Sequence, residues 1–137
     1  MSYASAAALQ EAVYQHLVAD TEISSAVGLH IYDAIPSGEL PRTYIALGPE
    51  DVRDRSDATG SGADHRFEVS IVTETTGFSA AKSLAALVEN ALATADLTLA
   101  EGRLVGLWFV RASARRTGRA GRIRRIDLRF RARVEHD

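Results

Sequence analysis

The sequence predicts a single α+β domain over residues 1–137, in which a mostly antiparallel β-sheet carries two main helices on one face. Three observations lead to this fold class. Two segments repeat apolar residues with the period of a helix. Several others alternate apolar and polar side chains, as half-buried strands do. Turn-forming residues lie between neighbouring strands, and such hairpins favour an antiparallel sheet.

The first helix is predicted over residues 5–19. Apolar side chains recur every fourth position from Leu9 to Leu17, and Ser5 is a plausible N-cap. Residues 21–27 are predicted to form a second short helical turn, which ends at the glycine that follows them.

Residues 29–73 are predicted to contain three strands and one long connecting segment. Residues 29–35 are extended up to a proline, and residues 43–47 are a short strand that ends at Gly-Pro. Residues 50–63 have no apolar periodicity and form either a long mobile loop or an extended hairpin tip. Residues 65–73 alternate cleanly between apolar and polar side chains, which predicts a strand.

The second half of the chain is predicted to hold one helix and two strands. The helix is predicted over residues 78–94, with Ser79 as its N-cap. A strand follows at 103–114, a glycine-rich turn at 117–121, and a last strand at 123–134. The predicted order is therefore α, β, β, β, α, β, β.

Charge is distributed unevenly along the chain. The net charge is −2, yet eleven of the sixteen basic residues and only three of the eighteen acidic residues lie in residues 103–137. Such polarity is typical of a protein that binds a polyanion or that places a basic surface against an acidic surface of another subunit.

No residue pattern indicates catalysis, and the chain is predicted not to be an enzyme. It has no cysteine, and its four histidines form no metal-binding spacing. The spaced aspartates of residues 51–57 lack the glycine and glutamate of a calcium loop, and no phosphate-binding glycine motif is present. We therefore expect no catalytic, metal or cofactor-binding residue. No apolar run is long enough to span a membrane.

The strongest functional signal is an arginine-rich hairpin at about residues 111–125. It is interpreted either as a contact surface for an anionic partner or as a solvated sheet face. The mobile segment at about residues 50–63 is the second candidate. The candidate interface residues are Arg115, Arg116, Arg119, Arg122, Arg124 and Arg125 in the hairpin, and Asp51, Arg53, Asp54, Arg55 and Asp57 in the segment.

Short motifs along nearly the whole chain, in a characteristic order and spacing, resemble a known family. They are residues 7–17, Ile31-Tyr32-Asp33-Ala34-Ile35-Pro36, Gly62 to Phe67, Ala80-Ala81-Lys82, Gly102 to Val105 with Trp108-Phe109-Val110, and Arg129-Phe130-Arg131-Ala132. Through them the chain resembles the small tail-completion, or tail terminator, proteins of long-tailed phages and gene transfer agents.

The resemblance implies a structural component of a phage-like particle, assembled in the cytoplasm. Such proteins form a ring, typically a hexamer, on the head-proximal end of the tail tube, where the ring stops tube polymerisation and joins the tail to the neck. The implied partners are further copies of the chain, the tail tube protein and a neck, stopper or connector protein. DNA passes through the lumen without specific binding. No catalytic residues or cofactors come with the family.

The alternative hypothesis is a nucleic-acid-binding module that uses the arginine hairpin. The absence of aromatic residues between the arginines disfavours it. We therefore expect Arg115, Arg116, Arg119 and Arg122 to contact acidic residues on another protein chain.

Overall fold

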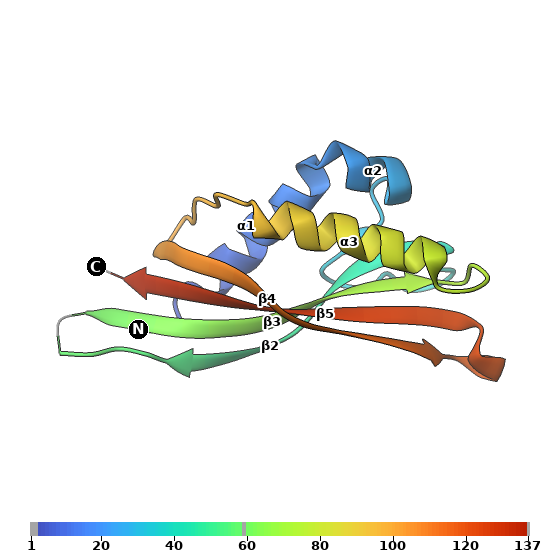
Figure 1. Cartoon of the computed structure of the whole chain (residues 1–137). Helices are drawn as coiled ribbons and strands as arrows, with labels where there is room; N and C mark the ends of the chain where they lie inside the picture. The colour runs from blue at the N-terminus through green and yellow to red at the C-terminus, as the bar shows by residue number, and fades with distance from the viewer. Residues whose placement is uncertain (1–2, 59, 137) are drawn as a thin grey trace.

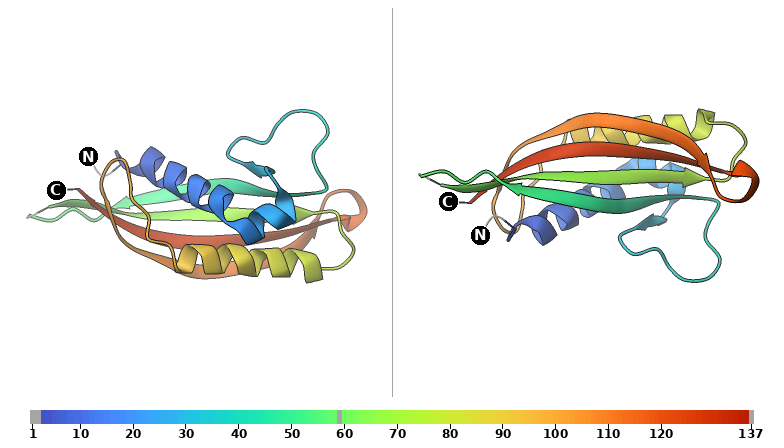
Figure 2. Two further views of the ribbon diagram at one scale, coloured as in Figure 1. Left: turned by 90° about the horizontal axis from the view of Figure 1, so that it is seen from above. Right: turned by 90° about the horizontal axis from the view of Figure 1, so that it is seen from below.

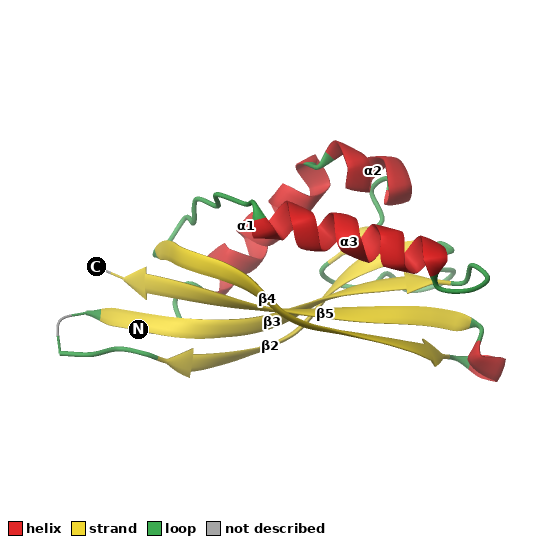
Figure 3. Cartoon of the chain, in the orientation of Figure 1, coloured by secondary structure: helices red, strands yellow, loops and turns green. Residues whose placement is uncertain are grey.

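In the computed structural model, which describes residues 3–58 and 60–136, three helices lie on one face of a five-stranded sheet (Figures 1 and 3). The elements, in chain order, are α1 Ala6–Ala19, α2 Thr21–Val27, β1 Ile31–Tyr32, β2 Thr43–Asp54, β3 Ser61–Thr73, α3 Ser79–Ala93, β4 Arg103–Thr117, the 3-10 turn η1 Arg119–Gly121 and β5 Ile123–His136. The predicted α+β class, with helices on one face, is confirmed.

The strands lie side by side in the order β1-β2-β3-β5-β4. The short β1 runs parallel to β2, and every other neighbouring pair is antiparallel. One continuous row of paired residues crosses the whole sheet through Ile31, Ile45, Ile71, Ile126 and Ala114. The row shows that β1 and the last residues of β4 lie at the same level along the strands, on opposite edges of the sheet.

The apolar core lies between the sheet and the helices. The helix α1 contributes Leu9, Val13 and Leu17, which are at most 2% exposed because the four-residue spacing places them on one face. Alternate residues of β5 point into the same layer, as predicted: Ile126, Leu128, Phe130, Ala132 and Val134.

Residues 50–63 form the second of the two predicted alternatives, an extended hairpin. The strand β2 continues past Pro49 to Asp54, and β3 begins already at Ser61. A register shift between Leu47 and Glu50 allows this, because a bulge can hold a proline that has no amide hydrogen to donate. The one residue of this segment outside the described ranges is Thr59.

The predicted strand over residues 29–35 is much shorter in the structure. Only Ile31 and Tyr32 pair with β2, and every residue from 33 to 40 is exposed. Within the described chain, the backbone of residues 34–41 bonds to no other backbone group. Residues 33–42, hereafter the β1–β2 loop, therefore project from the sheet edge without regular structure (Figure 2).

Two capping predictions need correction. The serine Ser5 does precede α1, but its hydroxyl does not cap the helix and instead contacts the ring of His136 near the other end of the chain. The residue Ser79 is the first residue of α3, and Phe78 occupies the N-cap position. The capping side chain that the structure does contain is Asp20, which accepts hydrogen bonds from two amides of α2, each at 3.0 Å.

No helix among the described residues is both long enough and apolar enough to cross a membrane.

Candidate interaction surfaces

No helix covers the face of the sheet opposite α1 and α3 (Figure 2, right). Charged side chains lie along this face. Antiparallel pairing of β3 with β5 sets an acid opposite an arginine in two cross-strand rows of this face, Asp64 opposite Arg133 and Glu68 opposite Arg129. In the row between them, Arg66 lies opposite Arg131. The Arg129 guanidinium donates to the Glu68 carboxylate at 2.6 Å, so this surface neutralises much of its own charge.

The most buried acid on this face is Asp64, whose side chain is 2% exposed. It accepts hydrogen bonds from Arg55 at 2.9 Å and from Arg131 at 3.3 Å, and Arg133 lies 3.9 Å away. Burial alone would raise the pKa of Asp64, but the hydrogen bonds and charges of Arg55 and Arg131 outweigh it and lower the pKa. The carboxylate therefore stays ionised and ties the β2–β3 hairpin to β5.

Half of the predicted arginine cluster has partners within the chain. The guanidinium groups of Arg115 and Arg125 share the carboxylate of Asp127, at 3.4 and 2.9 Å. The side chain of Arg124 lies over the Phe78 ring at 5.9 Å and donates to two carbonyls of the turn. These three arginines hold the hairpin together, and sequence reasoning did not identify Asp127 as the anchor of Arg115 and Arg125.

The other half of the cluster faces solvent. In the described part of the chain, Arg116, Arg119 and Arg122 are exposed and form no ion pair with a carboxylate. They surround the β4–β5 turn, where Gly118 and Gly121 adopt positive φ angles of 76° and 63°. This turn is the part of the predicted hairpin that is available to an acidic partner.

The second predicted group lies at the far end of the molecule. The β2–β3 turn projects from one end of the sheet and the β4–β5 turn from the opposite end (Figure 1). Local bonds shape the β2–β3 turn: Arg53 pairs with Asp51 at 3.0 Å, the Ser56 hydroxyl donates to Asp54, and the amide of residue 60 donates to Asp57. The two predicted groups therefore form two separate surfaces.

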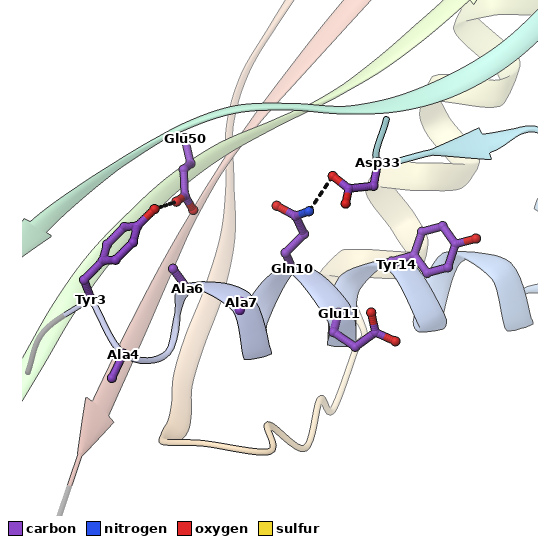
Figure 4. A pocket seen from close by; sticks show the side chains of 9 residues that line it. All are labelled: Tyr3, Ala4, Ala6, Ala7, Gln10, Glu11, Tyr14, Asp33 and Glu50. Atoms are coloured by element: carbon purple, nitrogen blue, oxygen red, sulfur yellow. Dashed lines mark hydrogen bonds between the residues drawn. The ribbon is translucent and has the colours of Figure 1, made fainter. Parts of the chain in front are cut away.

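A hollow of about 700 Å³ lies between the start of α1 and β2 (Figure 4). The hydroxyl of Tyr3 donates to Glu50 at 2.7 Å, and the amide of Gln10 donates to Asp33 at 2.6 Å. The bond to Glu50 and the negative charge of that residue raise the pKa of Tyr3. With Glu11 also on the wall, the lining is acidic and contains no basic residue among those described, so it suits a cationic surface better than an anionic ligand.

The edge strand β4 exposes a group of large apolar side chains, namely Val105, Trp108, Phe109 and Val110. The Trp108 ring lies on Gly106, where an added Cβ would come within 2.4 Å of it, and under the Arg131 guanidinium at 5.1 Å. The sequence showed these apolar residues but not that their strand would be an edge.

An apolar groove of about 350 Å³ runs beside these residues, between α3 and β4. Its lining residues are Lys82, Ala85, Ala86, Glu89, Phe109, Ala112, Ala114, Ile126 and Leu128. Alanines on both elements leave the groove open, because no large side chain fills the space between helix and strand.

The imidazole of His65 is fully buried on the helix-facing side of β3. Neither ring nitrogen has a hydrogen-bond partner among the described residues. Burial lowers the pKa of His65, although the charges of Glu50 and Asp64 oppose the shift. The ring is therefore neutral in the folded protein at neutral pH. No group of three or more metal-ligating side chains occurs within the described ranges.

This histidine should make stability depend on pH. Because the folded-state pKa is lowered, the unfolded chain takes up a proton first when the pH falls below about 6.5. We expect the unfolding free energy to decrease by up to about 1.4 kcal/mol per pH unit between about pH 6.5 and the folded-state pKa. Urea denaturation from pH 8 to 5 measures this slope, and His65→Leu should reduce it. An unchanged slope in that variant would assign the dependence to other groups.

The exposed apolar edge and the charged ends of the sheet are typical of a protein that acts through contacts with other chains. Residues 11–135 match the family described as Tail completion protein gp17, and the chain belongs to this family. It is similar to a chain in a structure described as "Virion of native gene transfer agent (GTA) particle". The two are 58% identical with a TM-score of 0.92, and the match covers 98% of this chain and 99% of that one. No curated protein matches the chain. The predicted resemblance to tail-completion proteins is thus confirmed.

Proposed function

We propose that the protein is a tail terminator of a gene transfer agent or phage-like particle, which forms a ring on the head-proximal end of the tail tube. The observation that carries this proposal is the likeness over almost the whole of both chains to a protein of a gene transfer agent virion. The ring stops tube polymerisation and joins the tail to the neck. It acts by binding, without chemistry, and passes DNA through its lumen.

The geometry supports different contacts for the ends and the edges of the sheet. The β2–β3 turn and the β4–β5 turn point in opposite directions along the strands. In a ring whose axis follows the strands, one turn would face the tube and the other the neck. The sheet edges would then face neighbouring subunits. The exposed Arg116, Arg119 and Arg122 are the residues available to acids of a protein bound at their end.

Particles made without this protein should carry tails of uncontrolled length that are not joined to heads, as seen by negative-stain electron microscopy. The wild-type chain should restore normal tails. The triple variant Arg116→Glu/Arg119→Glu/Arg122→Glu should form the ring but fail to restore normal tails, because it inverts the charge of one end. The control Arg66→Glu changes an exposed arginine in the middle of the sheet, away from both ends, and should restore normal tails.

Normal tails without the protein would overturn the proposal. Normal tails together with steeply salt-dependent DNA binding of the purified chain would favour the nucleic-acid-binding hypothesis. The same exposed arginines would then bind phosphates.

A further inference from the structure

We propose that the β1–β2 loop of one subunit docks in the apolar groove between α3 and β4 of the next subunit. The inference rests on the proposed ring and names the contact that would build it. The occupant of the groove is thus a second copy of this chain, with Ile35 and Leu40 as the apolar contacts.

Apart from Tyr3, the exposed large apolar side chains of the described residues lie at the two opposite edges of the sheet. At the β1 edge, Ile35 is 50% and Leu40 is 39% exposed, and Leu29 lies just before β1. The other edge carries the apolar residues of β4, including Phe109 in the groove wall. Apolar patches of this kind on a small domain are typical of protein contact sites.

The two surfaces lie at matching levels. The row of paired residues that begins at Ile31, two residues before the loop, ends at Ala114 in the groove. A neighbouring copy placed beside the sheet, with little shift along the strands, would bring its loop to the groove. Figure 2 shows the loop and the pair α3–β4 on opposite sides of the molecule.

Charge favours the same arrangement. The loop carries Asp33 and Glu39, with Arg42 at its end, and adjoins the acidic hollow described above. On the groove wall Lys82 and Glu89 balance each other, and the receiving edge is basic because β4 exposes Arg111 and contains no acidic residue. An acidic edge would thus meet a basic edge, which promotes association in one orientation and disfavours pairing of like edges.

The contact uses two different surfaces, so it is heterologous. Repetition of a heterologous contact produces a closed ring when the rotation between copies closes, and a filament when it does not. An isologous contact, by contrast, would stop at a dimer. Docking of unlike edges therefore provides the heterologous contact from which a ring can close.

The absence of cysteine in the chain permits a direct test by disulfide cross-linking. The double variant Ile35→Cys/Ala86→Cys places one thiol on the loop and one at the exposed groove wall. After oxidation of the assembled oligomer, we expect a ladder of covalent multimers on a denaturing gel. Neither single variant should give the ladder, and an equal mixture of the two should give only dimers. In the matched control, Ala100→Cys replaces Ala86→Cys at an exposed site outside the groove.

A second variant tests whether the contact is needed. The change Ile35→Asp/Leu40→Asp affects only exposed side chains and should leave the circular dichroism spectrum unchanged. Light scattering should show the oligomer reduced to monomer. If the oligomer persists in this variant and the Ile35→Cys/Ala86→Cys variant gives no cross-link, the docking site is overturned while the ring stays intact. A wild-type chain that stays monomeric, even with the tube protein present, would overturn the proposed ring itself.

Discussion

Replacement of Phe130 by alanine should cost about 4 kcal/mol of unfolding free energy. The side chain is 1% exposed at the centre of β5, and its ring stacks on Phe67 with 5.6 Å between centroids. The Phe109 ring contacts it edge-on at 5.8 Å. Truncation removes the transfer energy of the ring, leaves a cavity and breaks both aromatic pairs. Since a domain of this size has roughly 5–15 kcal/mol of stability, the variant should be close to unfolding.

Urea denaturation monitored by circular dichroism measures the loss. The matched control is Phe109→Ala, the same substitution at a ring that is 41% exposed on the neighbouring strand. It should cost only about 1 kcal/mol, since much of that ring remains in water. Equal losses for the two variants would show that the core does not centre on Phe130.

Substitution of Asp64 by asparagine should have the second largest effect, a loss of about 3 kcal/mol. The change is nearly isosteric but leaves Arg55, Arg131 and Arg133 around a neutral amide that cannot balance them. The loss should fall short of that for a fully buried ion pair, because the Arg55 and Arg131 side chains are 47% and 41% exposed and water screens them in part. The matched control is Asp51→Asn, which affects an exposed pair on the same face and should cost under about 0.5 kcal/mol.

The pH dependence gives an independent check on Asp64. Its folded-state pKa is lowered, so its contribution to stability is complete above the ordinary value of about 3.9. The contribution is lost as the pH falls from there through the folded-state pKa. The difference in unfolding free energy between wild type and Asp64→Asn should therefore shrink in acid. A difference that stays constant from pH 7 to pH 3 would mean that ionisation of Asp64 contributes nothing.

Local patterns predicted most of the fold. The spacing of Leu9 and Leu17 and the alternation along β5 are set by the geometry of one element, and both were predicted correctly. At residues 50–63 the sequence permits either a loop or a hairpin, because the segment has no apolar periodicity and Gly48-Pro49 normally ends a strand. A bulge accommodates the pair, and only pairing with β3, distant in sequence, stabilises β2 beyond it.

The surfaces were harder to predict because they depend on strand order. The sequence indicated an arginine-rich hairpin, but it did not indicate that Asp127 would pair with two of its arginines. Nor did it indicate that Asp64 would pair with three arginines outside the hairpin, Arg55, Arg131 and Arg133. Nor could it reveal that β4 is an edge, since β5 pairs with β3 on its other side. Charge along a chain shows which residues are available for pairing, and the register of the strands decides which of them pair.

The two register shifts in β4 also bear on how a single subunit avoids aggregation. An exposed apolar edge strand usually offers a row of amide and carbonyl groups on which another strand can form. In β4 the shifts fall between Leu104 and Gly106 and between Phe109 and Arg111, on either side of the most apolar stretch. They interrupt the regular spacing of backbone groups that strand addition needs. The edge can thus accept side chains from a correctly shaped partner while resisting growth into amyloid-like sheet before assembly.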